Sequence, residues 1–229
     1  MYLKWSNLVR AKFLRRVNRF KAEVEVAGKK EYVYVPNPSP LEELLRKGRR
    51  ILLVPKEERQ KTAFDLLAVQ DKDIWVTVDS RLPNMMFKEA VLNSRLREFE
   101  GYRIEKENVR VGKSLIDFLL EKEGRIAYVE VKGCSLVIGK AALFPDAPTE
   151  RGRGHLRELI RAKQEGHQAY MVWMVQRPDA EELRPYKEKD KRFTIALREA
   201  IKGGVIPIAY LTEFDGAVMK LKGRIPVRT

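Results

Sequence analysis

The sequence predicts a mixed protein of α+β and α/β character, in which a small five-stranded β-barrel precedes an α/β domain with a mixed central sheet. Residues 8 to about 80 hold short apolar or alternating runs separated by turn residues, which is typical of a small barrel. From Asp79–Asn84 onward apolar residues recur every three to five positions, as in a helix. We therefore expect domains at residues 1–82 and 83–229.

Five segments of the first domain are rich in β-branched and aromatic residues and are expected to be strands. They cover residues 20–26, 31–35, 51–55, 64–69 and 74–78. Gly and Pro residues separate them, and a short helix fits residues 41–47. Five strands with one short helix are the arrangement of an OB-type barrel.

The second domain begins with a helix that includes Met85 and Phe99 and ends at Gly101, followed by a strand over 102–111. A hairpin, an extended stretch over 134–144 and a helix from Glu150 to Glu165 come next, and Thr149 is the expected N-cap. A strand at 169–175, a helix over 190–202 and a strand at 205–211 then indicate a parallel pair.

The charge balance points to a polyanionic partner. The 229 residues include 46 Lys and Arg against 32 Asp and Glu, a net charge of +14. Nucleic acid is the first expectation and an anionic membrane the second. No apolar run is long enough to span a bilayer and the start lacks the features of a signal peptide, so we expect a cytoplasmic, nucleoid-associated protein that does not bind membrane.

The single cysteine, Cys134, cannot form an internal disulfide. One Cys with two His also excludes a Cys/His zinc site. We expect Cys134 to be a small buried residue without a catalytic role, because no Cys–His arrangement is visible.

Cations and aromatic rings alternate around the first strand region. The cations expected to contact phosphates are Lys12, Arg15, Arg16 and Arg19. The rings close by are Phe13, Phe20, Tyr32 and Tyr34. Basic side chains beside exposed rings are what a barrel uses to hold phosphates and stack bases. The alternative is that the rings belong to the core and the arginines to a solvated face.

Two apolar runs joined at Glu123–Gly124 carry unexpected charges at Asp117, Glu130 and Lys132. If Glu123–Gly124 is a two-residue hairpin turn, the register places Asp117 opposite Glu130, with Lys132 on the same face. Like charges at opposed positions destabilise the pairing unless a cation neutralises them. Mg²⁺ suits two carboxylates completed by water and phosphate oxygens. The alternative is that these acids end their strands and face water.

The helix from Glu150 presents a stripe of cations made by Arg153, Arg157 and Arg161, with Arg151 and His155 near its start. A helix N-terminus favours anions, so we expect Arg151, Arg153, His155 and Arg157 to contact phosphates. The alternative is a solvated face compensated by Glu158 and Glu165.

Three segments resemble the sugar fermentation stimulation protein A family across essentially the whole chain. They are ID-x₁₂-EVKG, the KEA of residues 88–90 and LFPDAPTERGRGHLREL of residues 143–159. The resemblance implies an OB-like domain and a domain similar to the PD-(D/E)XK nucleases. It also implies Asp117 and Glu130 as metal ligands, Lys132 as the catalytic lysine and Glu89 as a helix glutamate completing the site. The segment VPNPSPL departs from the His-x-Pro-Asn-Thr-Gly pattern of many relatives.

Two functions follow as expectations. The first is sequence-nonspecific DNA binding with a Mg²⁺- or Mn²⁺-dependent centre that cuts phosphodiesters. The second is a non-catalytic DNA-binding regulator linked to sugar metabolism, as the resemblance suggests. The sequence leaves open whether the protein forms a homodimer and whether it prefers single-stranded or duplex DNA.

Overall fold

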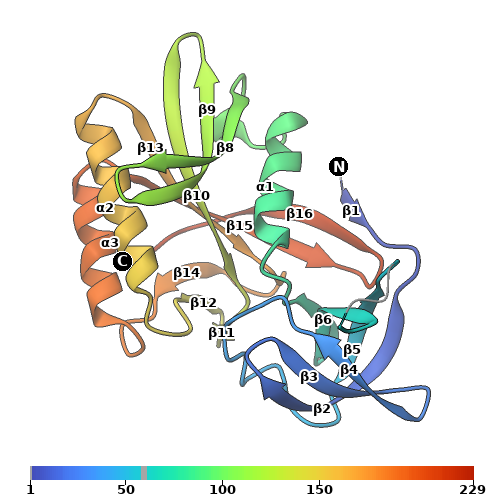
Figure 1. Cartoon of the computed structure of the whole chain (residues 1–229). Helices are drawn as coiled ribbons and strands as arrows, with labels where there is room; N and C mark the ends of the chain where they lie inside the picture. The colour runs from blue at the N-terminus through green and yellow to red at the C-terminus, as the bar shows by residue number, and fades with distance from the viewer. Residues whose placement is uncertain (1, 58–60) are drawn as a thin grey trace.

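The computed structural model describes residues 2–57 and 61–229. Figure 1 shows the N-terminal barrel beside the larger α/β part, and the strands of both join into one 13-stranded sheet. Its main path runs β4-β3-β2-β5-β6-β7-β15-β13-β10-β9-β8. Within the described residues no helix is long and apolar enough to cross a bilayer.

The barrel is built from five strands, as expected. They are β2 (Val9–Asn18), β3 (Lys21–Val26), β4 (Lys29–Tyr34), β5 (Arg50–Pro55) and β6 (Phe64–Asp71). The antiparallel ladders run from β4 through β3, β2 and β5 to β6, and a parallel pairing of Tyr34 with Asp65 closes the ring. Its core is apolar, with Phe13, Val24 and Leu53 essentially unexposed.

Two predictions for this region are wrong in detail. The segment 74–78 becomes β7 (Ile74–Thr77), which pairs with β6 over four residues and with β15 at Trp75 but lies outside the ring that β2 to β6 close. Residues from Val9 onward supply the fifth strand of that ring. Residues 41–47 form turns and not a helix, because Leu41 has a left-handed φ of 53° that a helix cannot contain. Leu41 and Leu44 instead fill the barrel core.

The helix after the barrel is shorter than predicted. Helix α1 (Leu82–Leu92) ends well before Gly101, because Ser94 has a φ of 50°. A short 3-10 helix, η1 (Arg97–Phe99), and strand β8 (Arg103–Val111) follow. The other strands of the main sheet are β1 (Tyr2–Lys4), β9 (Ser114–Lys122), β10 (Arg125–Cys134), β13 (Gln168–Val175), β15 (Ile206–Phe214) and β16 (Val218–Ile225).

The α/β part has the expected mixed sheet. Strands β10, β13 and β15 are parallel, whereas β8, β9 and β16 pair antiparallel with their neighbours. A separate small sheet contains β11 (Val137–Ile138), β12 (Ala141–Phe144) and β14 (Glu182–Pro185). Strand β1 pairs with β16, so the first residues of the chain join the sheet of the second domain.

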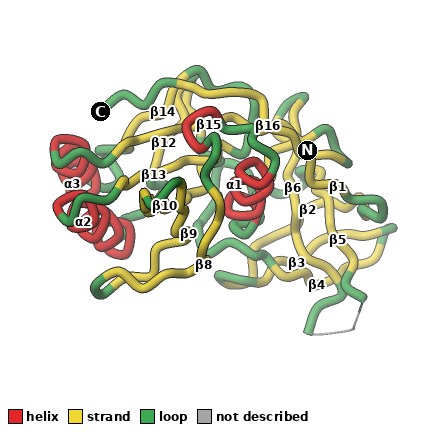
Figure 2. Tube along the Cα trace, turned by 90° about the horizontal axis from the view of Figure 1, so that it is seen from above, coloured by secondary structure: helices red, strands yellow, loops and turns green. Residues whose placement is uncertain are grey.

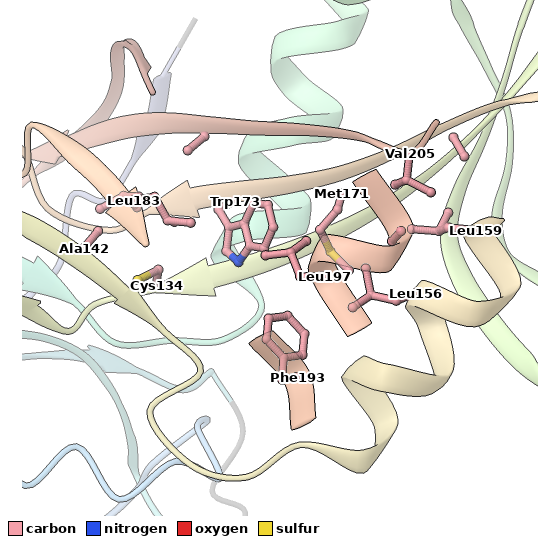
Figure 3. Close-up of a cluster of buried hydrophobic side chains, with 14 of the residues drawn as sticks. Cys134, Ala142, Leu156, Leu159, Met171, Trp173, Leu183, Phe193, Leu197 and Val205 are labelled. Atoms are coloured by element: carbon pink, nitrogen blue, oxygen red, sulfur yellow. The ribbon is translucent and has the colours of Figure 1, made fainter. Parts of the chain in front are cut away.

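The centre of the sheet is buried on both faces, and its strand β13 is apolar at nearly every position. Met171 and Trp173 point to the core beneath α2 (Glu150–Gln164) and α3 (Lys191–Lys202), where Phe193 packs (Figure 3). Tyr170 and Val172, one residue out of phase, point to the core beneath α1. Figure 2 shows α2 and α3 together on one side of strands β10 and β13 and α1 on the other side.

Polar contacts fix the barrel against the α/β part. Gln176 donates to Thr77 Oγ1 at 3.3 Å and to the carbonyl of Asp79 at 3.2 Å. Arg177, only 5 % exposed, bonds to Asp71 of the barrel at 3.2 Å. Buried partners of this kind hold the two domains in one relative position.

Candidate metal-dependent active site

The β9–β10 hairpin has the predicted turn and register. Glu123 and Gly124 have φ values of 51° and 78°, the two positive values that a type I′ turn requires. Lys122 pairs with Arg125, and the ladder continues to Phe118 and Val129. The ladder ends at that pair, and the side chain of Asp117, the next residue of β9, accepts from the backbone N–H of Val131 on β10.

Both acids line a cavity of about 420 Å³ between the two domains. Lys132 and Asn84 line it from the α/β part, and residues 37–40 line it from the barrel. Asp117 accepts hydrogen bonds from Asn84 Nδ2 at 2.9 Å and from the backbone N–H of Val131 at 2.8 Å. Burial, followed by the charge of Glu130, raises the pKa of Asp117 above its usual value.

Glu130 is only 1 % exposed and is held by two neighbours. Its Oε1 contacts the Lys132 ammonium and His155 Nδ1, whereas its buried Oε2 has no hydrogen-bond partner among the described residues. Burial acts to raise the pKa of Glu130, but Lys132 and His155 outweigh it and the pKa is lowered. Of the two acids, Glu130 therefore ionises more readily than Asp117.

His155 is a positioning residue for Glu130. It is 2 % exposed, and its Nε2 accepts from Arg151 Nε at 3.3 Å. Because Nε2 accepts, the proton of a neutral ring lies on Nδ1 and is donated to Glu130. The structure therefore places His155 beneath the site, where it supports Glu130, and not at the surface where the predicted phosphate contact would be made.

The donor set fits a hard cation held by two carboxylates. In residues 2–57 and 61–229 no cluster of three or more His, Cys, Asp or Glu side chains could hold a metal ion. Two carboxylates with an unpartnered buried oxygen suit an ion that completes its shell with water and phosphate oxygens. Hard divalent cations such as Mg²⁺ and Ca²⁺ are ions of this kind.

The helix side chain that reaches the acids is Asn84 and not Glu89. Asn84, in the first turn of α1, bonds to Asp117, whereas Glu89 is not among the residues that line the cavity. Five residues along a helix correspond to a shift of about 7.5 Å and a rotation of roughly 140°. The helix therefore directs the two side chains to different places.

Of the cations predicted on α2, one lines the cavity. Thr149 caps the helix as expected, accepting from the N–H of Gly152 at 3.0 Å. Arg151 is exposed and lines the cavity. Arg153 bonds to the buried Asp190, the N-cap of α3, at 3.0 Å, which gives it a structural role, and Arg157 is exposed outside the cavity.

The barrel cations also separate into two kinds. Lys12 and Arg15 form exposed ion pairs with acids of β3 at 3.7 Å and 2.7 Å. Arg19 is exposed and lines the cavity, as a phosphate contact would. Arg16 instead braces the loop at the cavity rim, because it donates to five backbone carbonyls, those of Asn18, Arg19, Asn37, Ser39 and Pro40.

Sequence reasoning missed Asn84 and Asp146 in the cavity. Asp146 accepts from Ser39 Oγ at 3.1 Å, and burial raises its pKa. Asp146 lies in the FPDAP segment, which is part of the family resemblance, but the sequence analysis assigned this acid no role. Cys134 is buried as predicted, and burial raises the pKa of its thiol to about 12.

Comparison with known proteins agrees with this architecture. The model for the sugar fermentation stimulation protein RE domain matches residues 81–217, and that for the SfsA N-terminal OB domain matches residues 14–78. The predicted order of an OB-like barrel followed by an α/β domain with a mixed sheet is confirmed.

Individual relatives match over almost the full length. The sugar fermentation stimulation protein homologs of Caldanaerobacter subterraneus subsp. tengcongensis and Acetivibrio thermocellus are 39 % and 41 % identical, over 96 % and 97 % of each chain. The structure of Pyrococcus furiosus SfsA in complex with Ca²⁺ is 32 % identical, with a TM-score of 0.93 over 99 % of this chain and 98 % of that one.

Proposed function

This chain belongs to the sugar fermentation stimulation protein family, and we propose that it binds DNA without sequence preference and cuts phosphodiesters with a divalent cation. The observation that carries the proposal is the meeting of Asp117, Glu130 and Lys132 in one cavity, with a buried oxygen of Glu130 left unpartnered among the described side chains. Acids crowded in this way are stabilised by a cation.

The cavity residues have separate tasks. Asp117 and Glu130 supply the oxygens that would hold Mg²⁺ or Mn²⁺, and His155 with Asn84 keeps those carboxylates oriented. A divalent cation bound there supplies Lewis-acid polarisation of a phosphoryl oxygen and a more acidic water. Lys132 stabilises the negative charge that develops on the phosphate, and Arg19 and Arg151 at the rim hold the flanking backbone.

The solved relative supports a divalent cation. Pyrococcus furiosus SfsA was solved in complex with Ca²⁺, and this chain shares its fold at 32 % identity. Ca²⁺ and Mg²⁺ are both hard cations that prefer oxygen ligands, in agreement with the two carboxylates here.

One observation favours the non-catalytic alternative. Glu130 Oε1 already contacts the ammonium of Lys132 and the ring of His155, so this acid is neutralised without a metal ion. In a regulatory DNA-binding protein this pairing would persist and the cavity would only anchor a phosphate.

Nicking of supercoiled plasmid distinguishes the two functions. We expect the wild type to cut with Mg²⁺ or Mn²⁺ and to stop in EDTA. Lys132→Met, which keeps the stem but removes the charge, is expected to cut about 10²-fold more slowly, because it loses one stabiliser of the transition-state charge. Equal nicking by both proteins would indicate a contaminant, and DNA binding without metal-dependent nicking would favour the regulator.

The two side chains of α1 provide a sharper test of the site. Asn84→Ala is expected to lower the cleavage rate about 10–100-fold, because Asp117 loses the partner that orients it. Glu89→Gln, on the same helix but outside the cavity, is expected to retain the wild-type rate. Initial rates at saturating Mg²⁺ measure both, and a large loss in Glu89→Gln would show that this glutamate reaches the metal.

A further inference from the structure

A second hollow lies on the barrel next to the candidate active site. It measures about 1220 Å³ and is open to solvent. Its lining includes two aromatic rings, those of Phe20 and Tyr34, and four cations, Lys21, Lys56, Lys61 and Arg81, against two acids. We call this surface the barrel groove.

The rings of the barrel groove are displayed and not buried. Phe20 is 43 % exposed and stacks on Tyr34, with ring centroids 6.1 Å apart and planes inclined by 24°. Tyr32 shares the face of β4 with Tyr34 and is 44 % exposed. By contrast, Phe13 of the same barrel is 2 % exposed and belongs to the core. The sequence could not separate these rings, but the structure does.

Cations sit directly on these rings. Lys21 Nζ lies 4.0 Å from the centroid of Tyr32, Lys56 Nζ 5.3 Å from that of Tyr34, and Arg19 Cζ 5.6 Å from that of Phe20. Lys56 also pairs with Asp65, whereas neither Arg19 nor Lys21 has a carboxylate partner in the part of the chain that the structure describes. A phosphate would compensate these two charges.

The backbone that displays Phe20 is held in place. The N–H of Phe20 donates to Asn18 Oδ1, and its carbonyl accepts from the N–H of Val35, both at 2.9 Å. Arg16 donates to the carbonyl of Arg19, the preceding residue. The backbone at Phe20 is therefore already ordered before a ligand binds, so the loss of conformational entropy on binding is small there.

The barrel groove and the candidate active site are lined by residues adjacent in the chain. Arg19 lines the cavity of the acids, and the next residue, Phe20, lines the groove. The same holds for Ser80 and Arg81 on the other side.

We propose that the barrel groove holds a single-stranded stretch of DNA and feeds it into the cavity of Asp117 and Glu130. A phenyl ring has no polar atom for a phosphate, and in a duplex the base faces are hidden in the stack, so an exposed Phe stacks best on an unstacked base. The inference rests on the proposed function and names its substrate as DNA with a single-stranded segment.

Fluorescence anisotropy with labelled oligo-dT and a blunt duplex of the same length, about 15 nucleotides, tests the proposal. The full-length protein is used in EDTA, so that no cleavage is needed. Phe20→Ala is expected to lower the ratio of single-strand to duplex affinity about tenfold, the loss of one base–ring stack. Phe20→Trp keeps a ring and should retain the ratio, whereas Phe20→Leu keeps only the apolar bulk and should lose it.

Ile195→Ala is the matched control, because Ile195 is 47 % exposed on α3 and lies outside both hollows. We expect it to retain the wild-type ratio. A ratio unchanged in Phe20→Ala, or a wild type that does not bind oligo-dT, would overturn the proposal. Plasmid nicking with Mg²⁺ separates this from failure of the proposed function, since a protein that does not nick can still show the predicted ratios.

Discussion

Asp117→Asn is expected to slow metal-dependent cleavage by roughly 10³-fold and, in metal-free buffer, to make the protein more stable. The rate falls because one of two metal-holding carboxylates is lost, and a bound cation supplies several kcal/mol of transition-state stabilisation. Stability rises because burial and the charge of Glu130 hold the pKa of Asp117 above its ordinary value, so its ionised form is unfavourable in the folded chain.

The Asp117→Asn variant can keep both hydrogen bonds of the aspartate. The side-chain oxygen that remains accepts from the N–H of Val131, and Asn84, with its amide turned over, accepts from the amide group that the substitution introduces. Steric disruption is therefore small, and the electrostatic change dominates the effect on stability.

The pH dependence has a definite sign. A carboxyl whose pKa is raised on folding costs stability above the folded pKa, and the cost disappears below the unfolded value, 3.8. The gain in melting temperature of Asp117→Asn should therefore be present at neutral pH and fade toward pH 3.8. Thermal unfolding in EDTA across this range measures it. A variant less stable than the wild type at pH 7 would contradict the expectation.

Arg16→Ala is expected to lower the free energy of unfolding by about 3 kcal/mol. Five backbone carbonyls lose a charged donor, and hydrogen bonds to charged groups are among the stronger ones in proteins. For a chain of this size the melting temperature should fall by roughly 6–12 °C. Thermal unfolding measured by circular dichroism checks the value.

Arg15→Ala provides the matched control for this substitution. Arg15 is the preceding residue, is exposed and forms an ion pair with Glu23 at 2.7 Å. Because solvent screens such a pair, we expect a melting temperature like that of the wild type. Similar losses in both variants would show that the carbonyl contacts of Arg16 contribute little.

The position of Asp117 relative to Glu130 could be predicted because it depends on few neighbouring residues. A Glu–Gly turn of two residues sets the pairing of the strands that it joins, and the alternation of side chains then sets the face. The cap at Thr149 follows a similarly local rule.

The roles of the cations and rings could not be predicted in the same way. Arg15 and Arg16 are adjacent and chemically identical, yet one faces solvent and the other reaches carbonyls more than twenty residues away. Phe13 and Phe20 likewise differ only in how the barrel closes around them. Charge and composition identify the residue types, but burial depends on which distant segments pack against each one.

The sequence by itself determined the two-domain order and the β9–β10 hairpin with its register from Lys122 to Phe118, because turn chemistry and strand alternation act over a few residues. Only the tertiary structure decided that Asn84 and not Glu89 reaches the acids, that His155 supports Glu130, and that the barrel groove opens beside them. These features depend on contacts between segments far apart in the chain, and a local sequence pattern does not determine which distant segments meet.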